Sequence, residues 1–224
     1  MSRAIEWGSI FYLSLLLWNT SSAQSAVGVW TLQQARIGLD KKERWQLVLI
    51  TQPRFTQKGW ETILGVGKVG YLVHRNHTVF VGGQWVEFYD PNRFQQKRAF
   101  LRWQWLPSSG FFLMTTLENR WQDGRLKELL FRPLGRYRIG AGQFWLNLSD
   151  EVFLSLWRAP QRVWQLYPRQ NRLWLTFSYP KEGAWQIEVG YLNITDDRLK
   201  VRHRLWIATR ANLSLAHRSR DNKR

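Results

Sequence analysis

The chain has 224 residues, of which 33 are Lys or Arg and 16 are Asp or Glu, so its formal net charge at pH 7 is +17. A field of this sign favours polyanionic partners such as phospholipid headgroups, acidic polysaccharides or nucleic acid. The lack of cysteine excludes disulfides, thiolate metal sites, cysteine nucleophiles and a lipid-modified N-terminal cysteine. The length suits one β-sandwich or barrel, and because no low-complexity linker divides the chain, we expect a single domain.

The chain begins with the pattern of a secretory signal peptide. Arg3 precedes an apolar run that ends near Trp18, and small residues follow at Ala23 and Ser25. This run is short for a membrane-spanning helix, which needs about 20 residues, and suits the hydrophobic region of a signal peptide. We therefore predict a signal peptide over residues 1–25 and export to the periplasm or cell envelope. An uncleaved N-terminal anchor is the alternative.

After Ala26 the apolar residues alternate with polar ones instead of recurring every three or four positions, which predicts strands. The predicted strands are VGVWTLQQAR, RWQLVLIT, GYLVHR, HTVFVGGQWVEFYD, RAFLRWQWL, GFFLMTTLENRW, RLKELLFRP, QFWLNLS, EVFLSLWR and four segments after Gln161. Turn residues separate them, as at Pro168 to Asn171, and Asp123-Gly124 is the strongest tight-hairpin signal. Arg125 to Phe131 could instead form a short helix.

Strands joined by such short turns usually pair with their neighbours in the sequence. The sequence therefore predicts an all-β fold: a single antiparallel up-and-down β-barrel or sandwich over residues 26–210, after the signal peptide. Residues 211–224 are rich in basic residues and are predicted to form a flexible tail.

The first predicted strand opens with Gly28-Val29-Trp30. This triplet resembles the Gly-x-Trp that begins many lipocalin-like, or calycin, barrels. The resemblance covers these three residues and the general β pattern. It implies that Gly28 and Trp30 form a structural signature at the barrel floor, that Arg202 or Arg204 packs over the indole, and that the barrel holds an apolar or amphipathic ligand.

Two other patterns fit catalytic or cofactor chemistry poorly. The segment GVGKVG, Gly65 to Gly70, has the glycine spacing of a dinucleotide-binding loop, but the strand-like YLVHRNHTVFV follows where a helix is needed. We expect a bend or bulge between strands there. His74 and His77 flank a predicted hairpin, and two ligands do not complete a metal site. The sequence predicts no cofactor, no metal site and no catalytic residue, hence a non-enzymatic protein.

Side chains alternate across a strand, so neighbours at two-residue steps assign each Trp to a face. Trp185 shares its face with Ile187 and Val189 and is predicted to be in the core, whereas Trp174 and Trp206 alternate with apolar residues and are predicted to point outward beside arginines. The candidate residues for binding a ligand or polyanion on this outward basic face are Arg162, Trp164, Arg172, Trp174, Lys200, Arg202, Arg204 and Trp206. Alternatively, the arginines only cover outward indoles by cation–π packing.

These patterns favour an exported, non-enzymatic binding or assembly protein. A lipocalin-like barrel would hold an apolar small ligand, or would dock on an anionic membrane surface or another polyanion through the basic face. An outer-membrane β-barrel is one alternative, since alternation and abundant aromatics are typical of that class. Against it, the late strands as assigned above would expose Arg and Lys. The predicted export argues against nucleic acid as a partner.

A third hypothesis comes from the glycosylation sequons. The Asn-x-Ser/Thr pattern occurs at Asn19, Asn76, Asn147, Asn193 and Asn212. These sites would suit a secreted viral or host glycoprotein that acts through a protein partner. In a bacterial protein the same sequons would stay bare.

Overall fold

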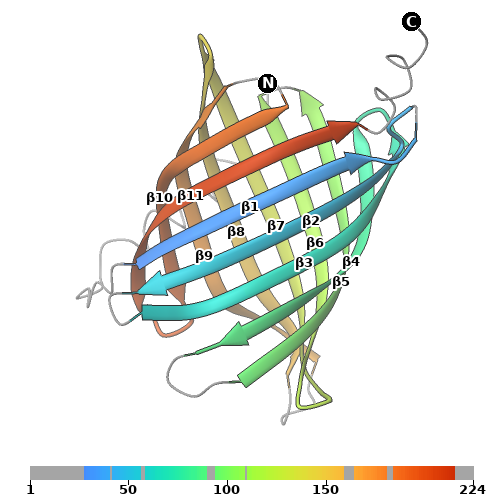
Figure 1. The fold of residues 1–224 in the computed structure, drawn as a ribbon. Coiled ribbons are helices and arrows are strands. Elements are labelled where there is room, and N and C mark those ends of the chain that lie inside the picture. Colours follow the sequence, from blue (N-terminus) through green and yellow to red (C-terminus); the bar gives the residue numbers. More distant parts are fainter. Residues whose placement is uncertain are drawn as a thin grey trace, which may run out of the picture.

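The computed structural model describes residues 28–40, 42–56, 59–89, 94–108, 110–158, 164–180 and 184–214. In these ranges the chain forms eleven β-strands that close into one barrel (Figure 1). Consecutive strands pair antiparallel all the way from β1 to β11. The predicted up-and-down barrel is thus confirmed, and the sandwich alternative is excluded. The predicted signal peptide, residues 1–25, lies outside the described residues.

The strands are 11 to 17 residues long. Their bounds are β1 (Gly28–Gly38), β2 (Trp45–Thr56), β3 (Gly59–His74), β4 (His77–Phe88), β5 (Phe94–Ser108), β6 (Phe111–Gln122), β7 (Arg125–Ala141), β8 (Phe144–Arg158), β9 (Trp164–Tyr179), β10 (Trp185–Asp196) and β11 (Val201–Ser214). The last strand includes the first four residues of the predicted tail, 211–214.

The first and last strands close the barrel by pairing in parallel. Their register runs from Gly28 opposite Arg204 to Gly38 opposite Ser214. With an odd number of strands, the chain enters the barrel at one end and leaves it at the other. We call the end with Gly28 the entry end and the end with Ser214 the exit end.

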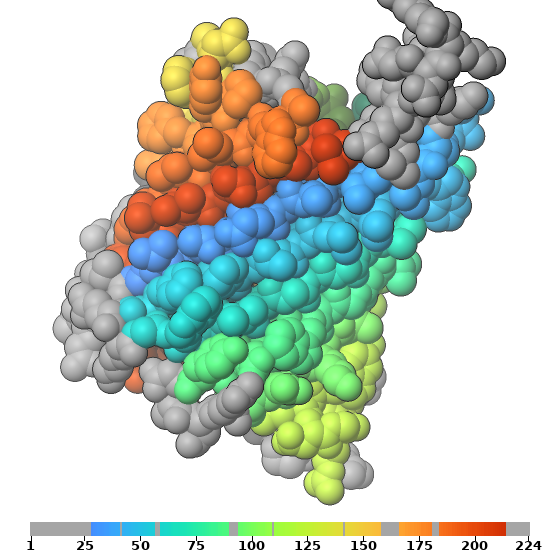
Figure 2. Space-filling model, in the orientation of Figure 1, coloured from blue at the N-terminus to red at the C-terminus, as the bar shows by residue number. Residues whose placement is uncertain are grey.

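The strands are strongly inclined to the barrel axis, as closure of a sheet requires. In the space-filling view β11, β1 and β2 cross the near face as unbroken diagonal bands (Figure 2). The hairpins at both ends are short, and the described ranges contain no helix long and apolar enough to cross a membrane.

Two predicted turns are confirmed. Asp123 and Gly124 connect β6 to β7, and both have the positive φ that a tight hairpin of the type I′ class requires, +53° and +71°. Arg75 and Asn76 likewise turn between His74 and His77, at the end of β3 and the start of β4.

Other predicted boundaries are wrong because residues that usually break strands lie inside them. Pro168 belongs to β9, where a register shift against β8 accommodates the missing N–H. The segment from Gly65 to Gly70 lies within β3 and pairs regularly with both neighbours, so it is neither a bend nor a bulge. Arg125 to Phe131 is strand, as part of β7.

The barrel wall is apolar on its outer face and charged on its inner face, the reverse of a soluble barrel. Large apolar side chains are exposed on its outside, among them Leu49, Val81 and Leu101, while Glu118 and Arg132 are buried inside. Alternation along each strand produces this arrangement, since every second residue points into the barrel.

The predicted faces of the tryptophans are therefore inverted. Trp185 is 65% exposed and is not in the core, whereas Trp174 and Trp206 are 7% and 6% exposed and lie inside the barrel. His203 shares the outer face with Leu205 and contacts the hydroxyl of Tyr191. The period of two was correct, but the apolar side of the wall faces outward.

Candidate functional site: the barrel interior

The barrel interior is lined mainly by charged side chains, and basic residues outnumber acidic ones there. The inward-facing basic residues are Arg36, Arg54, Lys68, Arg98, Arg102, Arg120, Arg132, Arg136, Arg138, Arg172, Arg202, Arg204 and Arg210. The inward-facing acidic residues of the strands are Glu118, Glu128, Glu151 and Glu188, together with Glu61 of β3, which contacts Trp30 and Arg204. A buried charge is costly unless it is paired, so these groups are expected to form ion pairs.

One ion-pair network is centred on Arg132 of β7. Its guanidinium donates to Glu151 of β8, with Nη2 2.7 Å from Oε1, and to Glu118 of β6. Glu118 also accepts from Arg120 at 2.6 Å and lies 3.5 Å from Arg98. The network thus joins four neighbouring strands from the inside.

A second network is centred on Glu188 of β10. One oxygen of Glu188 accepts from the indole N–H of Trp206 at 3.0 Å, and the other accepts from Arg210. Arg136 approaches the same carboxylate to 3.7 Å and donates to Ser149 Oγ at 2.7 Å. Trp206, predicted to be a surface residue, is thus held by a buried hydrogen bond.

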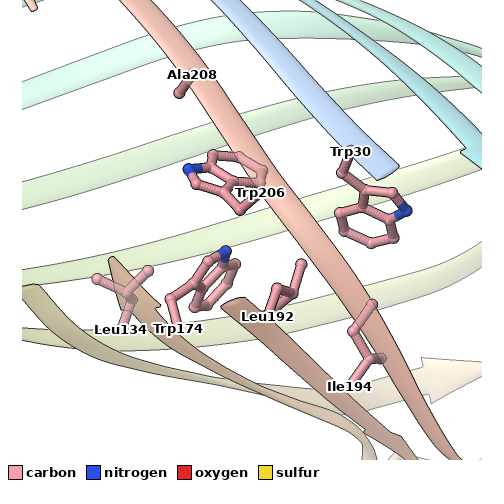
Figure 3. Packing of buried hydrophobic residues seen from close by; sticks show 7 residues of the cluster. All are labelled: Trp30, Leu134, Trp174, Leu192, Ile194, Trp206 and Ala208. Carbon is pink, nitrogen blue, oxygen red and sulfur yellow. The ribbon is translucent and has the colours of Figure 1, made fainter. Parts of the chain in front are cut away.

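An apolar cluster crosses the interior between these charged groups (Figure 3). The indoles of Trp174 and Trp206 lie edge to face with their centroids 6.4 Å apart, and Leu134 of β7 packs near them. The other members are Trp30, Leu192, Ile194 and Ala208, with Leu32, Phe112 and Met114 packed against them. Because these residues come from strands on opposite sides of the barrel, the cluster obstructs the interior across the barrel axis.

Trp30 lies at the entry end of this cluster, where the lipocalin resemblance implied a covering arginine. The guanidiniums over its ring belong to Arg54, at 3.9 Å from the ring centroid, and Arg172, at 5.3 Å. Arg204 is linked to Trp30 through Glu61. The Glu61 carboxylate lies 3.5 Å from the Arg204 guanidinium and accepts a hydrogen bond from the Trp30 N–H at 3.2 Å. Two arginines do cover the Trp, but they come from β2 and β9 rather than from the last strand.

A cavity of about 170 Å³ opens beside the aromatic cluster. Five arginines line it, whereas Glu151 is its one lining carboxylate among the residues that the structure describes. The arginines are Arg54, Arg98, Arg102, Arg132 and Arg172. Indole and phenyl rings, including those of Trp30, Phe100 and Phe153, form its apolar side.

The residues proposed from the sequence as an outward basic face have several locations. Arg172, Trp174, Arg202, Arg204 and Trp206 occupy inward positions, so this part of the prediction was wrong about the face. Lys200 is exposed in the connection between β10 and β11. Trp164 opens β9, and Arg162 lies outside the described residues.

Sequence reasoning missed the inward residues of the middle strands. In RAFLRWQWL, Arg98, Phe100 and Arg102 alternate with Ala99, Leu101 and Trp103, the same pattern that singled out the late strands. That signal could have found Arg98 and Arg102. Their meeting with Arg54 and Arg172 depends on barrel closure, which no local pattern encodes.

Other site types have little support in the described ranges. No group of three His, Cys, Asp or Glu side chains gathers there to hold a metal ion. Asn147, one of the sequon residues, is buried and donates to Ser178 Oγ at 2.7 Å, so its amide faces the interior and not solvent.

Most exposed aromatic residues of the outer surface lie towards the two ends, whereas exposed aliphatic residues lie both between them and at the ends. Towards the exit end these aromatics are Trp45, Trp103, Tyr137, Phe144, Phe177, Tyr179 and Trp185, towards the entry end they are Trp60, Trp85 and Tyr167, and Tyr191 lies in the middle of β10. The exposed aliphatic residues between them include Leu49, Val69, Val81, Leu101, Leu117 and Val189.

Together these features define a closed, up-and-down β-barrel with an apolar outer surface and a charged, basic interior. A family model matches residues 27–204, and the chain belongs to this family, DUF2490, whose members are described as proteins of unknown function. The search of curated proteins found no match. The lipocalin resemblance is not confirmed by these findings.

Proposed function

We propose that this protein is an integral β-barrel of the bacterial outer membrane, with a non-enzymatic role that depends on its charged interior. The proposal replaces docking on a membrane surface with insertion into the membrane. It retains the export predicted from the N-terminal sequence.

The observation that carries this proposal is the inversion of the barrel wall. Val81, Leu101 and Leu117 lie in one register row on the outer surface and are all exposed, whereas the inward side of the same strands holds Glu118 and Arg102. In water such an exposed apolar surface would promote aggregation. In a bilayer it would face lipid, and strands of 11 residues or more suffice, because a spanning strand needs about 9–11.

The distribution of aromatic residues supports the same proposal. Trp and Tyr concentrate at membrane–water interfaces, where their rings combine an apolar body with a polar group. Bands of aromatics flanking an aliphatic zone are typical of membrane barrels. The outer aromatics at the two barrel ends, Trp45 and Trp185 at one and Trp60 at the other, match that pattern.

The interior favours a binding role over a wide aqueous pore. Trp30, Trp174, Trp206 and Leu134 meet across the axis, and ion pairs fill the space on both sides of them. A soluble lipocalin-like carrier is less well supported, because its cavity would need an apolar lining and its outside a polar one.

Two matched arginine substitutions on the outer surface test membrane insertion. Val81 lies in the body of β4 and Val73 near the exit-end hairpin, and their exposed fractions are nearly equal, 62% and 61%. Arginine on the lipid face costs about 2–4 kcal/mol at the midplane and about 0–1 kcal/mol near the interface. We therefore expect Val81→Arg to lower the free energy of unfolding in lipid vesicles by about 2 kcal/mol or more, and Val73→Arg to change it little.

The measurement is a denaturant titration of the reconstituted barrel, together with mobility on SDS gels before and after boiling. The wild-type chain should remain in the membrane fraction after urea extraction and shift its mobility on heating. Recovery of the wild-type chain in the soluble fraction would contradict the proposal, as would equal stability of the two variants in lipid.

A further inference from the structure

We infer that the cavity beside Trp30 is a binding site for a small organic anion of the carboxylate class, held between Arg54 and Arg172. The inference goes beyond the proposed function, because it concerns the interior alone and would hold in detergent as well as in lipid.

The first argument is the charge balance around the cavity. Five guanidinium groups line it, and the carboxylates within ion-pair distance of those groups, among the described residues, are Glu118 and Glu151. Arg132 uses both of these carboxylates. A low-dielectric interior makes the remaining positive charge unfavourable, and a bound anion would compensate it.

The second argument is the hydrogen-bonding capacity of two particular arginines. The Nε atoms of Arg54 and Arg172 are buried and have no hydrogen-bond partner. The terminal nitrogens of these residues already contact Gln52 at 3.2 Å and Gln170 at 3.2 Å, which fixes the orientation of both guanidiniums. Each therefore keeps one unpartnered Nε–H beside an Nη2 that has a second hydrogen, and this edge of a guanidinium matches the two oxygens of a carboxylate.

The third argument concerns the apolar part of the ligand. Arg54 and Arg172 both stack on the Trp30 indole, and Arg172 also lies 4.2 Å from the centroid of Phe153. The cavity continues along Phe100 and the indoles of Trp174 and Trp206. At about 170 Å³ it can admit a compact ligand with an apolar body, whereas an inorganic anion would leave the aromatic side unfilled.

Benzoate is a suitable probe, because it combines a carboxylate with a small apolar ring. Calorimetric titration of the purified, detergent-solubilised barrel should give saturable binding of benzoate and none of benzyl alcohol, which has the ring without the charge. Arg54→Gln and Arg172→Gln should each weaken benzoate binding tenfold or more. Arg138→Gln removes the same charge from an inward position of β7 that does not line the cavity, and should bind benzoate like wild type.

Heat-modifiable mobility establishes that each variant is folded. If either Gln variant does not fold, Arg54→Lys and Arg172→Lys retain the charge but lose the planar edge, and should weaken benzoate binding several-fold. The inference is overturned if benzoate does not saturate the wild-type barrel, if the substitutions at 54 and 172 leave its affinity unchanged, or if benzyl alcohol binds equally well. None of these outcomes depends on insertion into a bilayer, so they are distinct from a failure of the proposed function.

Discussion

Trp174 and Trp185 each lie on the face of the barrel wall opposite to the one predicted from the sequence. Trp174 is packed against Trp206 inside the barrel, while Trp185 is the most exposed large apolar residue of the outer surface. Polar neighbours on alternate positions mark the lumen in this barrel, so an indole beside arginines is the buried one.

This difference predicts unequal effects of truncation. We expect Trp174→Ala to lower the free energy of unfolding in detergent by about 3–5 kcal/mol, since it removes a large side chain from a packed cluster. Trp185→Ala should change it by about 0.5 kcal/mol, as for an ordinary surface substitution. Denaturant titration of both variants measures the two values, and a larger loss for Trp185→Ala would refute the inward position of Trp174.

At this scale the sequence predicts which residues share a face, but not which face is inside. For Arg202 to Trp206 the alternation is correct residue by residue, whereas Lys200 is exposed in the connection before β11 and Val201 is buried. The face assigned to the interior is wrong because the prediction placed the apolar side chains inside the barrel, as is usual for a protein surrounded by water. The contacts of Trp30 with Arg54 and Arg172 could not be predicted, since strands that are distant in the chain supply them.

At the scale of elements, most strands and the tightest hairpin follow from local sequence. The turn at Asp123-Gly124 requires positive φ at both residues, and few dipeptides adopt it readily, so this turn could be predicted from the sequence. The register shifts that keep Pro168 within β9 could not be predicted from the sequence, because the partner strand determines where a bulge is tolerated.

Strand β10 contains an inward glycine at a point of close approach to β9. A Cβ at Gly190 would overlap the carbonyl oxygen of Leu175 and lie 2.5 Å from Cα of Thr176. Both are backbone atoms, so the strands themselves would have to move. We expect Gly190→Ala to lower the free energy of unfolding by about 1–3 kcal/mol, the usual cost of overpacking.

A matched control is available in β7. At Gly135 the nearest atom to a new Cβ is Leu113 Cδ2 at 3.8 Å, an ordinary contact. Gly135→Ala should be neutral or stabilise the barrel slightly, by up to about 1 kcal/mol, because alanine restricts the unfolded chain. Equal destabilisation by both substitutions, measured by denaturant titration, would show that the β9–β10 contact is not the cause.

At the scale of the whole molecule, the up-and-down path places hairpins alternately at the two ends. Arg75 lies in the β3–β4 turn at the exit end, and Arg198 lies in the β10–β11 turn at the entry end. Both are exposed, and the chain has no cysteine of its own. Arg75→Cys and Arg198→Cys therefore introduce single thiols on opposite sides of the proposed membrane.

A maleimide carried on a polyethylene glycol too large for porins should label one of these two variants on intact cells and both after lysis. The labelled variant identifies the end that faces the medium. Labelling of both variants on intact cells would be incompatible with a barrel that spans the outer membrane.

The parallel pairing of β1 with β11 also bears on how the barrel assembles. Every other strand pair is joined by a short connection and can form as a hairpin while the chain is incomplete. The β1–β11 pair has the largest sequence separation in the sheet, and contacts of this kind are slow to form because they close the longest loop. Until β11 is in place the sheet has two open edges, β1 and β10, which can pair with other chains. The last strand therefore decides whether this chain becomes a closed barrel or an aggregation-prone sheet.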